Sequence, residues 1–311
     1  MRHLSDKALA RLRDGTELPD LSGTRYRLIA QVARGGMGVV YAAEDQRLQR
    51  RVALKVLEVP GNDGDLAHRL MREACVLARL EHPGIVPVHD AGALTDGRAF
   101  YCMKYVEGQT LAQHVAGKSL PEKLRLLERI AEPLDFAHAR GFVHRDLKPE
   151  NIMIGAFGEV LIMDWGLATM AHTLRTGQGG VLGTPGYMSP EQARGTNDID
   201  HRTDIFSLGA ILAFMLTGMA SGEAPTVTSG VAPPLRAICE KALAADPDAR
   251  YRSAGALAAD TVRYLGGEPV LAHPEGLLER AGRVYARHRT AIVLITVYLL
   301  MRFLFILFAR S

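Results

Sequence analysis

The sequence predicts an α+β fold in which a small β-rich lobe is followed by a larger helical lobe. Short strand-type runs gather before residue 107, whereas from Leu111 onward the apolar residues mostly recur at helical spacing. A third observation is the apolar run 291–309, which predicts a separate C-terminal helix. With 311 residues, of which 48% are apolar, the chain is long enough to bury a sizeable core.

The strands of the small lobe are predicted from short apolar runs bounded by turn residues. These runs are YRLIAQVA (26–33), VVYAAED (39–45) and VALKVLEV (52–59). Apolar residues at helical spacing predict one helix over 66–80. Two further strand-like runs surround GALTDGRAFY, whose Thr-Asp-Gly predicts a hairpin turn. The small lobe is therefore expected to be a sheet with one helix.

The large lobe is predicted from longer helical patterns, such as LPEKLRLLERIAEPLDFAHARG over 120–141. Another helix is expected to end with LAFMLTG (212–218), and a later one to cover PPLRAICEKAL (233–243). Gly, Pro, Ser and Thr dominate the fourteen residues between them, 219–232, which predicts a loop.

Charge and cysteine content exclude some classes of protein. Lys and Arg total 37 against 34 Asp and Glu, a net charge of +3 that does not suggest nucleic-acid binding. The three scattered cysteines fit neither a metal site nor a disulfide framework, which favours a reducing compartment. The first residues predict a short amphipathic helix over 4–13 and lack the apolar run of a signal peptide.

Several motifs carry chemistry only in combination. The run ARGGMGVV (33–40) would let backbone N–H groups approach an anion, although glycine-rich hairpins without ligands are common. Lys55 in VALK and Glu73 on the predicted helix would each be an ordinary surface residue when taken alone. HRDLKPEN (144–151) and Asp164-Trp165-Gly166 follow them. In this order and spacing, the motifs resemble those of the protein kinases.

The chain resembles a bacterial eukaryotic-like Ser/Thr protein kinase over about residues 24–267, which implies the bilobal protein-kinase fold. The resemblance implies transfer of the ATP γ-phosphate to Ser or Thr hydroxyls of protein substrates, with Mg²⁺, or alternatively Mn²⁺, as the metal. The implied catalytic residues are Asp146, Lys148, Lys55 and Glu73, and the implied metal ligands are Asn151 and Asp164.

The resemblance also implies an ATP-binding cleft, in which FYCMKYVEG (100–108) is the hinge beside the adenine. The residues expected to line this cleft are Val32, Ala33, Gly35, Gly36, Gly38, Val40, Ala53, Lys55, Met103, Lys104 and Val106. Ala33 replaces the first glycine of the nucleotide loop, so we expect weakened but retained ATP binding, provided that φ is negative there.

Regulatory and structural roles follow from the same resemblance. Arg145 before Asp146 is similar to that of kinases switched by phosphorylation of the activation loop, and Thr176 or Thr173 is the expected phosphosite. The expected structural residues are Thr184 near Asp146, Glu191 paired with Arg250, and Asp204 below the catalytic loop. Trp165 is expected to fill the apolar site that a phenylalanine usually occupies in this family. The 219–232 segment is shorter than usual in the family, so the sequence does not predict how a protein substrate docks.

The C-terminal run AIVLITVYLLMRFLFILFA predicts a transmembrane helix over 290–309, since nineteen helical residues span about 28 Å. The arginines of a basic juxtamembrane segment, 268–289, would keep the kinase on the cytoplasmic side of the cell membrane. Only Arg310 and Ser311 follow, so no extracellular sensor domain is expected. The alternative is a helix buried against another protein. The sequence does not decide whether two chains form a homodimer through the span.

The domain boundaries that we expect are a leader (1–23), a kinase N-lobe (24–107), a kinase C-lobe (108–267), the juxtamembrane segment and the span. One alternative function is a pseudokinase, which would bind nucleotide and dock partners without transferring phosphate. Such proteins usually lack the equivalents of Lys55, Asp146 or Asp164, and all three are present here. A small-molecule kinase is the other alternative, and Thr184 and the segment Ser189-Pro190-Glu191 argue against it.

Overall fold

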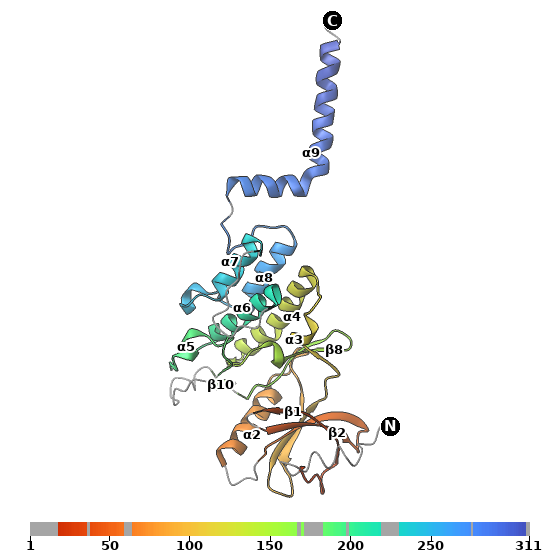
Figure 1. Cartoon of the computed structure of the whole chain (residues 1–311), viewed down its shortest axis with the longest axis vertical. Helices are drawn as coiled ribbons and strands as arrows, with labels where there is room; N and C mark the ends of the chain where they lie inside the picture. Colours follow the sequence, from red (N-terminus) through yellow and green to blue (C-terminus); the bar gives the residue numbers. More distant parts are fainter. Residues whose placement is uncertain are drawn as a thin grey trace.

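The computed structural model describes residues 18–35, 38–58, 64–166, 169–170, 183–196, 199–218, 230–274 and 276–308. It has two lobes and a C-terminal helix that leaves the larger lobe (Figure 1). This arrangement agrees with the predicted bilobal α+β fold. The predicted helix over 4–13, Gly36, both candidate phosphosites and most of the 219–232 segment lie outside the described residues.

The small lobe is a five-stranded antiparallel sheet in the order β1-β2-β3-β5-β4. Its strands are β1 (Tyr26–Gly35), β2 (Gly38–Asp45), β3 (Arg50–Val56), β4 (Val88–Ala93) and β5 (Ala99–Lys104), and its helix is α2 (Gly64–Arg79). Alternation along β3 separates two faces. Val52, Leu54 and Val56 enter a core on one face, while Ala53 joins the core on the other face, to which α2 also contributes.

Residues 18–22, at the end of the expected leader, pack against the turn between β4 and β5. The Thr95 hydroxyl donates to Asp20 at 3.0 Å, and the guanidinium of Arg98 donates to the Leu18 carbonyl at 3.1 Å. Leu21 is buried in the core of the small lobe. The end of the leader therefore belongs to the folded small lobe.

The large lobe is built around α6, which is buried along nearly its whole length. Its helices are α3 (Leu111–His114), α4 (Leu120–Ala139), α5 (Pro190–Ala193), α6 (Arg202–Thr217), α7 (Pro233–Ala242) and α8 (Ala254–Leu265), with short 3-10 turns η1 (Pro149–Asn151) and η3 (Pro247–Ala249). Its strands are β6 (Gly108–Thr110), β7 (Phe142–Val143), β8 (Ile152–Gly155), β9 (Val160–Ile162) and β10 (Thr169–Met170). They form a three-stranded sheet, β6-β8-β9, and the pair β10-β7.

Local sequence sets the helix ends. Ser119 and Glu122 form a capping box at the start of α4, because each side chain satisfies a free backbone N–H of the first turn. α6 ends at Gly218, whose φ of 73° is the left-handed conformation that glycine adopts without steric cost. These signals account for helix ends within two residues of those predicted.

A buried carboxylate fixes the chain where it leaves α8. Asp260 accepts hydrogen bonds from the backbone N–H groups of Leu271 at 2.9 Å and Ala272 at 3.0 Å. The Tyr251 hydroxyl donates to the same carboxylate at 2.9 Å. The segment after α8 is therefore tied to the large lobe up to residue 272.

Helix α9 (Leu277–Phe308) follows, with a kink at His288, where φ is −115° and ψ is 17°. Figure 1 shows that its second half points away from the large lobe. Among the residues that the structure describes, no helix is both long enough and apolar enough to cross a membrane. The predicted transmembrane helix is thus not confirmed, and Arg302, thirteen residues after Arg289, interrupts the apolar run.

Candidate active site

A buried lysine joins three elements on the inner face of the small lobe. Lys55 on β3 donates to both carboxylate oxygens of Glu73 on α2, each at 2.9 Å, and to Oδ1 of Asp164, after β9, at 2.8 Å. Burial alone would lower the pKa of Lys55, but the carboxylates of Glu73 and Asp164 outweigh burial and raise it. The ammonium therefore stays charged and is held at a fixed point between Glu73 and Asp164.

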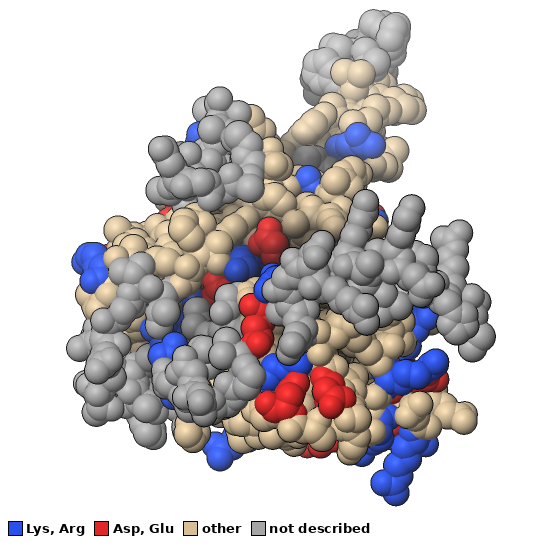
Figure 2. All heavy atoms as spheres, turned by 60° about the horizontal axis from the view of Figure 1, so that its bottom comes forward, with Lys and Arg blue, Asp and Glu red and all other residues tan. Residues whose placement is uncertain are grey.

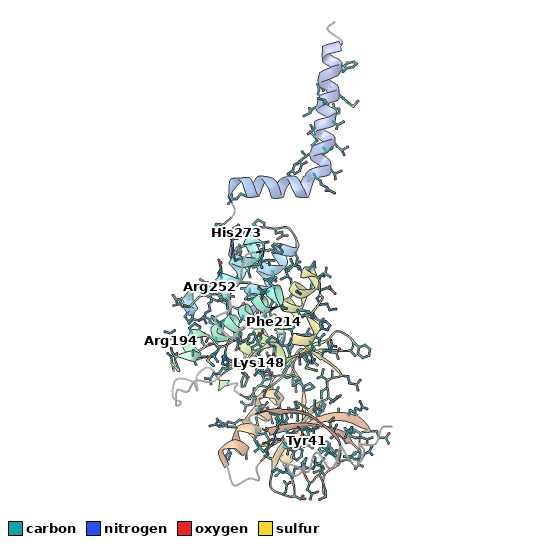
Figure 3. All side chains as sticks on the ribbon, viewed as in Figure 1. Tyr41, Lys148, Arg194, Phe214, Arg252 and His273 are labelled. Atoms are coloured by element: carbon teal, nitrogen blue, oxygen red, sulfur yellow. The ribbon has the colours of Figure 1, made fainter. Side chains whose placement is uncertain are left out.

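The catalytic loop predicted from HRDLKPEN brings Asp146 and Lys148 together with Thr184. The Thr184 hydroxyl donates to Oδ1 of Asp146 at 2.7 Å, while Lys148 donates to Oδ2 at 3.0 Å. Lys148 also donates to the Thr184 hydroxyl at 2.8 Å, which closes a ring of three contacts. Figure 3 shows Lys148 on the side of the large lobe that faces the small lobe. The carboxylate of Asp146 is thereby held in one orientation.

Asn151 and Asp164 supply oxygen atoms that suit a hard cation such as Mg²⁺. The Asn151 amide nitrogen donates to the Asp146 carbonyl at 2.8 Å, so the amide oxygen is the remaining polar atom of that side chain. The Asp164 side chain is 46% exposed, although Lys55 beside it is buried. Asp164 also has a φ of 59°, an uncommon conformation outside glycine that indicates a functional constraint. The donor set therefore fits the predicted metal.

Asp204, at the start of α6, anchors the catalytic loop by hydrogen bonds to its backbone. Its carboxylate accepts from the backbone N–H groups of His144 at 2.8 Å and Arg145 at 2.9 Å, and it lies 2.8 Å from Nε2 of His138. Burial alone would raise the pKa of Asp204, but the contact with His138 and the loop N–H groups lower it. The carboxylate is consequently ionised, and it supports Arg145 in a left-handed conformation with φ of 69°.

The residues expected around the nucleotide lie on β1, β2, β3 and β5, except Val106, which follows β5. Gly38 has a φ of 149°, and a Cβ there would lie 2.3 Å from the Val56 carbonyl, so only glycine fits. Ala33 pairs with Val40 and is not among the described non-glycine residues with positive φ. It therefore meets the condition set for retained ATP binding. The remaining described members of this set are Val32, Gly35, Ala53, Met103, Lys104 and Val106, of which Ala53 and Met103 are buried.

Trp165 is fully buried, as predicted for the apolar slot beside Asp164. Its ring packs on that of His144 with the centroids 4.7 Å apart. Its indole N–H has no hydrogen-bond partner among the described residues. The larger ring thus fits the core but leaves one buried donor unsatisfied, at a cost of about 1–3 kcal/mol.

Glu191 and Arg250 form the predicted ion pair in the large lobe. The guanidinium donates to both carboxylate oxygens, at 2.6 and 2.8 Å, and Thr203 donates to Oε1 at 2.8 Å. Arg250 also donates to backbone carbonyls, including that of Ala244 at 2.8 Å. Every contact is internal to the large lobe, so the pair is placed to stabilise the fold.

Sequence reasoning missed three residues of the site. Tyr101 donates from its hydroxyl to Glu73 at 2.7 Å, His138 contacts Asp204, and Gln192 donates to the Arg145 carbonyl at 2.7 Å. Tyr101 lies opposite Lys55 in the sheet, and register between strands so distant in sequence is not readable from the chain alone. His138 lies 66 residues before Asp204, and no local signal joins the two.

Surface charges are mixed on the face that Figure 2 displays, where Lys and Arg side chains are interspersed with Asp and Glu side chains.

The protein kinase domain family matches residues 26–254. Serine/threonine-protein kinase PknD of Chlamydia caviae is 36% identical over 79% of this chain and 32% of its own length. Serine/threonine-protein kinase PknB of Mycobacterium tuberculosis is 37% identical over 81% of this chain and 44% of its own length. The chain thus spans less than half the length of these curated relatives.

Solved structures agree with the sequence comparison. The crystal structure of the Mycobacterium tuberculosis PknI kinase domain superposes with a TM-score of 0.59 at 29% identity. The match covers 77% of this chain and 96% of that domain. Together with the matched residues 26–254 and the arrangement of Lys55, Glu73, Asp146 and Asp164, this likeness shows that the chain belongs to the protein kinase domain family.

Proposed function

We propose that the chain is an ATP-dependent Ser/Thr protein kinase. In the transfer, a substrate hydroxyl oxygen forms a bond to the γ-phosphorus of ATP, and the bond from that phosphorus to the β–γ bridging oxygen breaks. ADP leaves with the electron pair, and the hydroxyl proton passes to Asp146. The observation that supports this role best is the contact of Thr184 and Lys148 with Asp146, which fixes the orientation of that carboxylate.

The other residues of the site bind and orient the nucleotide in this proposal. Lys55, held by Glu73, would pair with the phosphates, and Lys148 would place positive charge beside the phosphoryl group in transfer. Asn151 and Asp164 would hold Mg²⁺, or Mn²⁺ in its place, and the ion when bound neutralises charge on the phosphates. The hinge backbone at Lys104 and Val106 would bind the adenine.

Autophosphorylation of the activation loop is part of the proposal. The backbone N–H and carbonyl of Arg145 are held by Asp204 and Gln192, next in the chain to the catalytic aspartate. An arginine at this place suits a phosphate on Thr176 or Thr173, because a guanidinium binds phosphate through two parallel hydrogen bonds. The physiological protein substrates remain to be identified by experiment.

The test is to incubate the full 311-residue chain with ATP and Mg²⁺ and to follow its intact mass and modified sites. We expect mass steps of one phosphate each, with Thr176 or Thr173 modified. Asp146→Asn is the matched control, since it keeps the shape of the side chain and removes the proton acceptor. Unmodified protein that still binds ATP would instead indicate a pseudokinase, which the complete set of Lys55, Asp146 and Asp164 does not support.

We also propose that α9 attaches the kinase to the inner face of a cell membrane for signalling there. Large apolar side chains on its second half are exposed, among them Leu294, Leu300 and Met301. Clustered exposed apolar residues mark surfaces that contact a membrane or another protein. The preceding arginines, which include Arg280 and Arg289, would face anionic lipid on the cytoplasmic side.

Flotation of the full chain with vesicles that contain anionic lipid tests this attachment. We expect the chain to float with the vesicles, and a variant with Leu294→Asp and Met301→Asp to remain at the bottom of the gradient. Extraction at alkaline pH then separates a spanning helix, which stays with the lipid, from a helix on the surface. Equal recovery of both chains at the bottom would exclude attachment through α9.

A further inference from the structure

We propose that Tyr101 is a positioning residue for phosphoryl transfer, because its hydroxyl holds the Glu73 carboxylate that in turn holds Lys55. This inference rests on the kinase activity proposed above and gives a role to Tyr101, which lies in the hinge segment FYCMKYVEG but was assigned none from the sequence. It concerns how the lysine is fixed before nucleotide arrives.

The geometry that carries the inference is a three-residue contact across the sheet and α2. Tyr101 on β5 is the cross-strand partner of Lys55 on β3, so both side chains leave the same face of the sheet. The tyrosine hydroxyl donates to Oε1 of Glu73 at 2.7 Å, and the ammonium lies 5.8 Å from the tyrosine ring centroid. All three side chains are buried.

This contact gives Glu73 a second support from the sheet, independent of Lys55. A buried carboxylate with one cationic partner follows that partner when it moves, whereas two donors from two strands define its position. Lys55 also bonds Asp164, so the lysine has two carboxylates between which to divide its donors. A firmly placed Glu73 would keep the ammonium in position for the nucleotide phosphates even if Asp164 held a metal ion instead of the lysine.

Tyr101→Phe would preserve the packing and remove one hydrogen-bond donor from Glu73. Burial raises the pKa of Glu73, and the hydrogen bonds from Lys55 and Tyr101 oppose that rise. Loss of one of them weakens the anchor of α2 beside the cleft. We therefore expect the affinity for ATP, which Lys55 would bind, to decrease, and the affinity for the protein acceptor to stay the same.

Steady-state kinetics of the full chain with Tyr101→Phe tests the proposal, using a generic Ser/Thr acceptor protein. We expect the KM for ATP to rise about tenfold, as for loss of one hydrogen bond to a charged group, with the KM for the acceptor unchanged. A purely structural weakening would lower the active fraction, and so kcat, and would leave both KM values as they were.

Tyr251→Phe is the matched control, because Tyr251 also donates from a buried hydroxyl to a buried carboxylate, Asp260, at 2.9 Å. We expect it to lower thermal stability about as much as Tyr101→Phe and to leave both KM values unchanged. In a Glu73→Gln background, Tyr101→Phe should raise the KM for ATP no further, because the carboxylate that it positions is gone.

Three outcomes overturn the inference. They are an unchanged KM for ATP in Tyr101→Phe, an undiminished effect in the Glu73→Gln background, and a chain that unfolds at assay temperature while Tyr251→Phe does not. The last outcome would assign the hydroxyl to the fold alone. These outcomes can be distinguished from failure of the proposed kinase activity, because in that case the unsubstituted chain would transfer no phosphate.

Discussion

Lys55–Glu73 in the small lobe and Arg250–Glu191 in the large lobe are both buried ion pairs, yet their surroundings differ. Arg250 is 0% and Glu191 7% exposed, and hydroxyl and carbonyl groups of the same lobe complete their hydrogen bonds. Lys55 instead shares its ammonium with Asp164, which is 46% exposed. The Arg250 pair finds its partners within one lobe, whereas the Lys55 pair extends to a carboxylate that is half-exposed.

The difference distinguishes an ion pair that maintains a fold from one that serves a reaction. A pair enclosed in one lobe that loses a partner leaves a charge buried with no access to water, which is strongly destabilising. A pair that extends to a half-exposed carboxylate lies where a ligand can reach that carboxylate, so we expect its loss to act also on what binds there. Substitutions in the two lobes should therefore separate stability from activity.

The largest effect is expected from Arg250→Ala, which leaves the Glu191 carboxylate without its bidentate partner. The free energy of unfolding should fall by about 3–5 kcal/mol. Denaturant titration followed by circular dichroism measures this change. A loss below about 1 kcal/mol would mean that water reaches Glu191.

Lys55→Met is expected to act on activity. Phosphoryl transfer should fall by about 10²–10³, the usual cost of removing one preorganised charge from an active site. The melting temperature should fall less than in Arg250→Ala, since Asp164 beside the vacated position is 46% exposed and water can reach it there. Radiolabelled ATP with a generic acceptor gives the rate, and a melting temperature as low as that of Arg250→Ala would remove the distinction between the pairs.

Lowering the pH should weaken the Arg250 pair. Burial alone would raise the pKa of Glu191, but hydrogen bonds from Arg250 outweigh it and lower the pKa to about 2, from an ordinary value of 4.5. A depressed pKa stabilises the fold above pH 4.5, and that stability is lost as the pH falls through 4.5 towards 2. We expect a loss of roughly 3 kcal/mol from this group.

Glu191→Gln isolates that contribution, because the amide does not titrate. Its free energy of unfolding should depend less on pH between 5 and 2 than that of the unsubstituted chain, with a difference of roughly 3 kcal/mol. Parallel pH curves for the two chains would show that Glu191 has the same pKa in the folded and unfolded states.

The smallest effect is expected at the surface. Arg51 lies 3.3 Å from Glu107, and their side chains are 61% and 66% exposed. Arg51→Ala should change the free energy of unfolding by about 0.2–1 kcal/mol, and added salt should reduce that change. This variant also serves as the exposed-arginine control for Arg250→Ala, and an equal loss in both would contradict the contrast between buried and exposed pairs.

Most of the fold was predictable, because apolar periodicity and capping residues are local. The predicted helix over 120–141 is α4 (Leu120–Ala139), and of the residues that the motifs single out, Lys55 contacts Glu73 and Asp164 while Asp146 contacts Lys148. Contacts that depend on strand register or on distant elements were not predictable. Tyr101 against Glu73 and His138 against Asp204 are of this kind, since neither has a local sequence signal.

The hydrogen bonds of Asp260 to residues 271 and 272 have a mechanical consequence for the whole molecule. Only four residues, 273–276, separate this attachment from the start of α9, and four residues reach at most about 14 Å. The first turn of α9 therefore cannot move far from the large lobe, and any motion of its second half relative to that lobe has to come from residues 273–276 or from the kink at His288.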